Sequence, residues 1–75
     1  MDDELTLAVA KILKDKQSDA GPSYTEIAER TSLSRPTVER ILNGRRDINM
    51  RYLHELCAVL GLDPAQVVAD AENAL

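Results

Sequence analysis

Helix signals recur along the whole of this 75-residue chain, and they constrain its fold more than any other feature. Apolar residues return every three or four positions, capping residues precede these runs, and a glycine follows several of them. The strict alternation of apolar and polar residues that a half-buried strand requires is missing from the sequence. The sequence therefore predicts an all-α fold of five short helices in one domain, residues 1–75.

The first helix is expected over about residues 3–16. Acidic residues open it and lysines close it, as the helix dipole favours, and the segment QSDAGP is expected to break it. Two supporting helices are expected near the C-terminus, at about 50–60 and 64–74, with Asn49 and Asp63 as their N-caps.

Two more short helices are expected between these, within about residues 23–44. Ser23 opens the first of the pair in a capping-box pattern, and either Ser34 or Arg35 caps the second. The dipeptide NG is the stop signal at the end of the pair.

Composition fits a small folded protein that functions in a reducing compartment. Hydrophobic residues make up 44% of the chain, and because Trp and Phe are absent, Leu, Ile, Val and Ala must form the core. The single cysteine cannot form an internal disulfide. The N-terminal MDDELT is acidic where a secretory signal would be basic, and no apolar run approaches membrane-spanning length. We expect a cytoplasmic protein without a membrane partner.

Charge is distributed unevenly along the chain. Residues 34–51 contain five Lys/Arg and two Asp/Glu, net +3, although the whole chain carries −4. Residues 1–33 (four Lys/Arg, seven Asp/Glu) carry −3, and residues 52–75 (no Lys/Arg, four Asp/Glu) carry −4. The five cations are Arg35, Arg40, Arg45, Arg46 and Arg51. Because salt screens charges beyond roughly 10 Å, a polyanion would respond to this local field rather than to the net charge.

The helix that follows Ser34 has an unusual outer face. At 100° per residue, three apolar side chains cluster on one side, and Pro36, Arg40 and Asn43 fall opposite them. The inward residues are Val38, Ile41 and Leu42. A proline, an arginine and an amide differ from the lysine–glutamate lattice of an ordinary solvated face, so this face is a candidate binding surface.

Two arginines stand at helix starts, where the helix dipole disfavours cations. Arg35 and Arg51 open the third and fourth expected helices, at a cost of a few tenths of a kcal/mol each. A docked phosphate would reverse the sign of this effect, because helix N-termini and arginine both favour phosphate. The pattern therefore indicates a polyanionic partner.

The segment SYTEIAERTSLSRPTVERILNGRR, followed by MRYLHELCAVLGLD, resembles the helix-turn-helix of the phage-repressor-like (Xre-type, lambda-repressor-like) family of DNA-binding regulators. Ile27 and Ala28 match the apolar-then-alanine pair of the first motif helix, and Gly44 matches the glycine that ends the recognition helix. The resemblance implies a five-helix fold with its helix-turn-helix at about residues 23–44. The piece LSRPTVERILNG also resembles the lactose-repressor motif, but that family places its motif at the extreme N-terminus.

Three positions depart from the family pattern. Ser32 stands where glycine is common at the turn, which predicts a strained, left-handed backbone there. Pro36 replaces a polar base-reading residue, so contact there would be apolar, for example with a thymine methyl. Leu42 replaces a glutamate that forms an internal ion pair in many relatives, which predicts a more apolar core.

The resemblance implies that the recognition helix, about residues 35–43, places its side chains at base edges in the major groove. Arg40 is the principal candidate, as a bidentate partner of guanine worth roughly 1–3 kcal/mol of discrimination. Arg35 can reach a base or a phosphate, and an i,i+4 pair with Glu39 is its alternative. The remaining base-edge candidates are Pro36 and Thr37.

Seven residues are expected to contact DNA phosphates, which position a protein without reading sequence. They are Ser23, Tyr24, Ser34, Asn43, Arg45, Arg46 and Arg51. Other roles stay open for some of them: Ser23 can cap its helix and Tyr24 can pack. Arg45 and Arg46 can instead pair with Asp47.

Catalytic and metal chemistry find little support in the sequence. His54 and Cys57 lie three positions apart, but Cys57 falls on the apolar stripe of its helix and is expected in the core. One Cys and one His cannot complete a structural zinc site, and paired-carboxylate and glycine-loop signatures are missing. We expect no enzyme activity, no metal and no cofactor.

The sequence thus predicts a sequence-specific binder of double-stranded DNA that regulates transcription, as a repressor because occupancy alone excludes polymerase. The resemblance implies a homodimer on a palindromic operator-like site, with the last helix as a candidate interface. Ala74 and Leu75, expected to be exposed, either pack on a partner or continue into a longer protein. The alternative is an antitoxin-like or adaptor protein that uses the same scaffold mainly to bind a protein.

Overall fold

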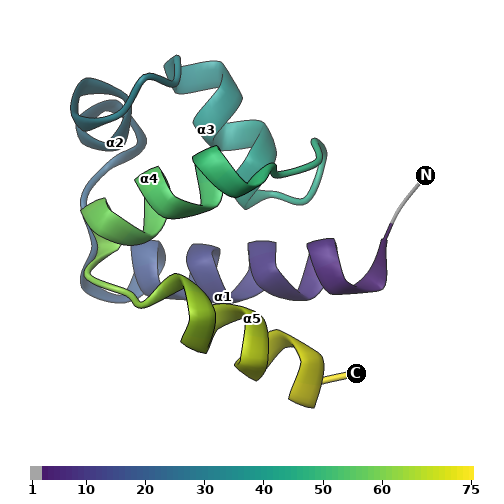
Figure 1. Ribbon diagram of the computed structural model, residues 1–75. Coiled ribbons are helices and arrows are strands. Elements are labelled where there is room, and N and C mark those ends of the chain that lie inside the picture. The colour runs from purple at the N-terminus through teal and green to yellow at the C-terminus, as the bar shows by residue number, and fades with distance from the viewer. Residues whose placement is uncertain (1–2) are drawn as a thin grey trace.

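The computed structural model describes residues 3–75, apart from the side chain of Ala20. Over these residues it contains five helices and no strand, which confirms the predicted all-α fold (Figure 1). The helices are α1 (Glu4–Ala20), α2 (Tyr24–Arg30), α3 (Arg35–Leu42), α4 (Met50–Leu60) and α5 (Pro64–Asn73).

Helix α1 continues to Ala20, beyond its expected end at Lys16. The polar residues after Lys16 tolerate helical geometry, and the helix stops only at Gly21, which is extended (φ −88°, ψ 175°) because Pro22 disfavours a helical residue before it. The Gln17 side-chain amide donates to the Pro22 carbonyl at 3.1 Å and fixes this end. The expectation that lysines close the helix is therefore wrong, since its last turn carries no basic residue.

The remaining helices begin at the capping residues that the sequence indicates. Ser23 and Glu26 form a reciprocal capping box at α2. At α3 the cap is Ser34 rather than Arg35, because the Ser34 Oγ accepts the Thr37 N–H at 3.3 Å. Asn49 and Asp63 cap α4 and α5 in the same way.

The turn between α2 and α3 does not have the left-handed backbone expected at Ser32. In the described chain every residue with a positive φ is a glycine. The Ser32 N–H and hydroxyl instead donate to the two carboxylate oxygens of Glu55, at 2.7 and 2.8 Å. The α4 carboxylate thus holds the turn in a conformation that costs serine nothing.

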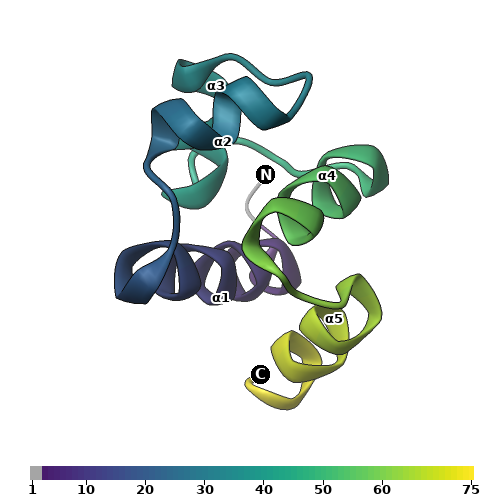
Figure 2. The ribbon, with the colours of Figure 1, turned by 90° about the vertical axis from the view of Figure 1, so that its left-hand side faces the viewer.

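All five helices contribute to one apolar core. Helix α1 packs against α3, α4 and α5, and α2 packs mainly against α3 (Figures 1 and 2). Fully buried side chains at the centre include Leu13, Ile27, Ile41, Leu56 and Cys57. Leu42 is also buried, as expected for an apolar residue on the inner face of α3. This packing leaves α3 at the edge of the molecule, away from α5.

Gly44 ends α3 in a left-handed conformation (φ 72°), as Gly61 does for α4 (φ 72°). An L-residue costs about 1–2 kcal/mol there, so Gly44→Ala and Gly61→Ala should each lower the free energy of unfolding by about that amount. At Gly44 the new Cβ would also lie 2.9 Å from the Leu7 Cδ2, whereas at Gly61 nothing lies within 4 Å.

Urea denaturation of both variants therefore measures two quantities. The Gly61 variant gives the cost of the backbone conformation alone, and any excess loss at Gly44 is the cost of moving the exposed Leu7 side chain. Equal stability of Gly44→Ala and the wild type would contradict the left-handed end of α3.

Candidate nucleic-acid interface

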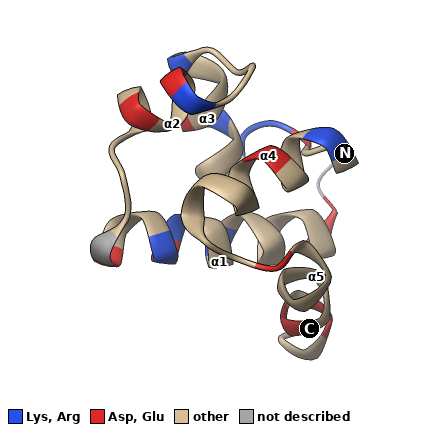
Figure 3. Ribbon diagram, turned by 60° about the vertical axis from the view of Figure 1, so that its left-hand side comes forward, with Lys and Arg blue, Asp and Glu red and all other residues tan. Residues whose placement is uncertain are grey.

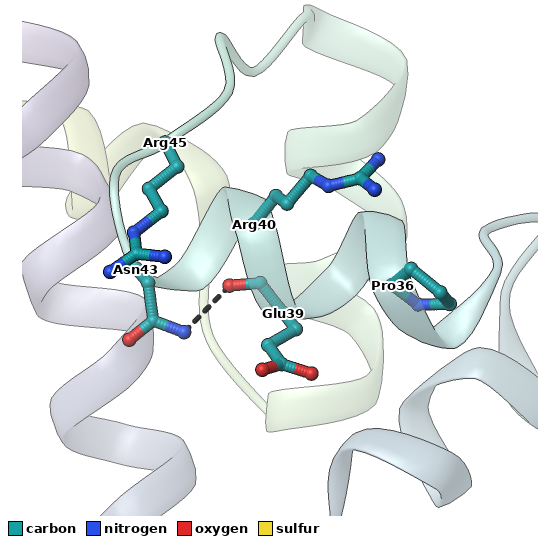
Figure 4. Close-up of a pocket in the computed structure, with 5 residues that line it drawn as sticks. All are labelled: Pro36, Glu39, Arg40, Asn43 and Arg45. Atoms are coloured by element: carbon teal, nitrogen blue, oxygen red, sulfur yellow. Dashed lines mark hydrogen bonds between the residues drawn. The ribbon is translucent and has the colours of Figure 1, made fainter.

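The outer face of α3 presents the polar side chains that the helical spacing groups together. Pro36, Arg40 and Asn43 are all exposed, and with Glu39 and Arg45 they line a shallow hollow (Figure 4). The Asn43 Nδ2 donates to the Glu39 carbonyl at 2.7 Å, which orients the amide at the end of the helix. With its side chains an α-helix is about 10–12 Å across, so α3 can enter the roughly 12 Å wide major groove of B-DNA.

The arginines at this face are not neutralised by neighbouring carboxylates. Across residues 3–75, ion pairs within 4.0 Å join Lys11 to Asp15 and Arg51 to Glu55. The alternative pair between Arg35 and Glu39 is therefore not formed, nor are the alternative pairs of Arg45 and Arg46 with Asp47. The guanidinium groups of Arg35, Arg40 and Arg45 remain available to an anion.

Arg46 lies across the N-terminal part of α3. Its Nη1 donates to the Thr37 Oγ1 at 3.4 Å, and its guanidinium carbon lies 5.8 Å from the Tyr52 ring centroid, within reach of a cation–π interaction. The Ser34 hydroxyl donates to the same Thr37 oxygen at 2.9 Å. Thr37 is half-buried and engaged by both neighbours, so it is less free to meet a base than Arg40.

Arg51, at the start of α4, shares its charge with Glu55. Its Nε lies 3.8 Å from the Glu55 Oε2, although 75% of its side chain is exposed. Hydrogen bonds from the Ser32 N–H and then the Ser32 hydroxyl, with Arg51 nearby, hold the pKa of Glu55 below its usual range. Because the folded state favours the ionised carboxylate, this stabilisation is present above the ordinary glutamate pKa and is lost as the pH falls through the lowered value.

The Tyr24 hydroxyl is contacted by Lys14 of α1 and by Asn43 at the end of α3. The Lys14 Nζ of α1 contacts the Tyr24 Oη and lies 4.7 Å from the ring centroid. The Asn43 Nδ2 lies 3.5 Å from the same Tyr24 oxygen. Two predicted phosphate contacts are thus brought together, and Lys14 joins them. Sequence reasoning missed Lys14 because no local pattern indicates a contact between residues ten positions apart on different helices.

The charges separate the two ends of the molecule. Cations lie on α3, on the loop to α4 and at the start of α4, whereas the charged residues of α5 are all acidic (Figure 3). Ser23 and Ser34, the two remaining predicted phosphate contacts, are exposed at the starts of α2 and α3. A polyanion would therefore approach the α3 side and be repelled from α5.

Cys57 and His54, the two residues that the sequence analysis considered for catalysis, lie on different sides of α4: Cys57 is in the core and His54 is exposed. Cys57 is fully buried, and burial, with Asp63 nearby, raises the pKa of its thiol, so it stays protonated. The exposed His54 has its Nδ1 2.9 Å from the Met50 carbonyl. In the described part of the chain, no helix is long and apolar enough to cross a bilayer.

Comparison with known proteins agrees with this geometry. A family model described as a helix-turn-helix domain matches residues 9–69. No curated protein and no solved structure matches the chain. Helix-turn-helix domains bind DNA by placing their second motif helix, here α3, in the major groove. Since the match covers most of its length, the chain belongs to the helix-turn-helix domain family, and DNA is the partner that this membership indicates.

Proposed function

We propose that the chain is a phage-repressor-like regulator that recognises an operator-like site in double-stranded DNA with α3 and represses transcription by occupying that site. The proposal depends mainly on the side chains at the outer face of α3. There Arg40 is exposed, unpaired among the described residues, and flanked by Pro36 and Asn43. An unpaired guanidinium on a helix that fits the major groove is suited to bidentate contact with guanine.

The proposed roles divide between bases and backbone. Arg35, Pro36, Thr37 and Arg40 are the proposed base contacts, and Arg40 carries most of the discrimination. Ser23, Tyr24, Ser34, Asn43, Arg45, Arg46 and Arg51 are the proposed phosphate contacts. Of the latter, Arg51 would have to share its charge between a phosphate and Glu55, so we expect it to contribute least among the arginines.

We further propose a homodimer that binds a palindromic site through two copies of α3. An apolar hollow between α4 and α5 supports this, because Leu53 and Val68 line it and Met50, on its border, is 66% exposed. Closed two-fold dimers are the commonest homo-oligomers, and they match palindromic DNA. Sedimentation equilibrium with and without duplex measures the stoichiometry, and a single copy per selected site would contradict this part of the proposal.

Titration against random duplex DNA at several salt concentrations tests DNA binding itself. If the five arginines of residues 34–51 together neutralise about five phosphate charges, the slope of log K against log[salt] should be roughly −4 to −5. Fluorescence anisotropy with a labelled duplex gives the constants, and a labelled acidic polypeptide of similar charge is the matched control. Selection from random duplexes followed by sequencing would then identify the bases and show whether half-sites are paired.

The same titration separates the alternative function. An antitoxin-like or adaptor protein that binds mainly a protein partner would show no duplex binding at low salt, or binding that does not change with salt. Either result would exclude the proposed DNA recognition.

A further inference from the structure

We propose that Lys14 of α1 completes a phosphate-binding site with Tyr24 and Asn43, and that this site holds a backbone phosphate of the DNA that α3 reads. The inference rests on the proposed function, and it adds a residue and a helix that the helix-turn-helix motif does not include. Three separate elements meet there: the middle of α1, the first residue of α2 and the C-cap residue of α3.

The three side chains form one hydrogen-bonded group. The Lys14 Nζ and the Asn43 Nδ2 both approach the Tyr24 Oη, the former in direct contact and the latter at 3.5 Å. The Asn43 amide is fixed by its 2.7 Å bond to the Glu39 carbonyl (Figure 4). Lys14 and Tyr24 are both half-buried, so their positions are constrained by packing.

Lys14 and Tyr24 keep unused donors in this group, whereas Asn43 orients them, because its two side-chain N–H groups are engaged by the Glu39 carbonyl and the Tyr24 oxygen. The Tyr24 oxygen accepts from two nitrogen atoms, so its own hydrogen must be donated elsewhere, and no acceptor for it lies among the described residues. The Lys14 ammonium has three N–H groups and uses one on Tyr24, and within residues 3–75 no carboxylate lies within 4.0 Å of it. Unused charged and neutral donors in one place call for an anion with several acceptor oxygens, and a phosphodiester has this chemistry.

The position of the group joins it to the face of α3. A hollow between α1 and the end of α3 is lined by Lys11, Lys14, Asp15 and Asn43 among others, and Asp15 is paired there with Lys11 at 3.4 Å. Asn43 also lines the hollow on the outer face of α3, beside Arg40 and Arg45. Because one residue borders both hollows, a duplex lying along α3 would bring its backbone to Lys14.

Charge-removing variants at two lysines of α1 test this role. Lys14→Gln should reduce the salt slope for random duplex by about 0.9, which at 0.1 M salt is about an eightfold loss of affinity. Lys16→Gln is the matched control, because Lys16 is exposed, lies on the same helix and lines neither hollow. Tyr24→Phe removes a neutral donor, so it should weaken binding at every salt concentration without changing the slope.

A wild-type slope for Lys14→Gln, or an equal change for Lys16→Gln, would overturn the inference while leaving the proposed function intact if the wild-type chain binds DNA. Failure of the wild-type chain to bind would overturn both. Lys14→Arg keeps the charge and should restore the slope, which separates loss of charge from loss of the side-chain packing on Tyr24.

A second measurement needs no variant. With ¹³C-dimethylated lysines, the NMR signal of Lys14 should shift when duplex is added, and that of Lys16 should not. A second titration with inorganic phosphate at the same ionic strength shows whether the Lys14 signal responds to a free anion or to the DNA backbone. A Lys14 signal that responds to inorganic phosphate and not to duplex would contradict the inference.

Discussion

Leu56→Asp should leave the chain unfolded at room temperature. Leu56 is 0% exposed and lies at the centre of the core, where α4 meets the other helices. A carboxylate there would be buried without a partner, at a cost of several kcal/mol or more. A domain of this size has only about 4–11 kcal/mol of stability in total. Circular dichroism at 222 nm, with a thermal scan, should show the loss of helix and of a cooperative transition.

The matched control is Ala58→Asp on the same helix. Ala58 is exposed, so the new carboxylate stays in water and the free energy of unfolding should change by about 0.5 kcal/mol or less. Leu56→Met keeps the volume of the side chain and should cost less than about 1.5 kcal/mol. A cooperatively folded Leu56→Asp would mean that α4 does not present this face to the core.

Arg40→Ala should lose discrimination at one base pair and keep most of its affinity for random DNA. The bidentate contact proposed for Arg40 is worth roughly 1–3 kcal/mol, or about a fivefold to 150-fold preference at the selected site. Its side chain is exposed and makes no ion pair among the described residues, so stability should not change. Competition titrations of selected against random duplex measure the preference directly.

Replacing the contacted guanine by 7-deazaguanine removes the N7 acceptor and tests the same contact from the DNA side. The wild-type protein should lose affinity for the modified site, and Arg40→Ala should lose none beyond its own deficit. Independent, additive losses from the protein variant and the modified base would contradict the proposed contact.

Arg46→Ala provides the contrast, because a phosphate contact affects all sequences alike. It should weaken selected and random duplexes about equally and reduce the salt slope by roughly one unit. Some loss of stability is also expected, since Arg46 lies near the Tyr52 ring and donates to Thr37. If Arg40→Ala and Arg46→Ala gave the same pattern, the division into base and phosphate contacts would be wrong.

Local patterns in the sequence predicted most of the helices. Capping residues such as Ser23 and Asn49 act on their own neighbours, so their effect can be read without knowledge of the fold. The expected end of α1 at Lys16 is too early, because the polar residues after it tolerate a helix and only the Gly21-Pro22 pair prevents helical geometry. One or two residues determine where a helix ends, so the polar composition of a segment is a poor predictor of that position.

The candidate site was predictable where it lies on one helix and unpredictable where it joins several. The spacing of Pro36, Arg40 and Asn43 places them on one face whatever surrounds the helix. The contact of Lys14 with Tyr24 depends on how α1 and α2 are placed by their separate packing against α3. Glu55 reaches Ser32 across 23 positions, and this contact removes the backbone strain expected at the turn. Such contacts follow from packing angles, which no local pattern specifies.

Backbone amide shifts measured by NMR during titration with a selected duplex test the central claim most directly. If α3 binds DNA through its outer face, the largest shifts should fall on residues 34–46, with smaller shifts at Tyr24 and Lys14 and almost none on α5. Shifts concentrated on α5 and on the hollow beside Met50, with α3 unchanged, would contradict the proposed recognition of DNA.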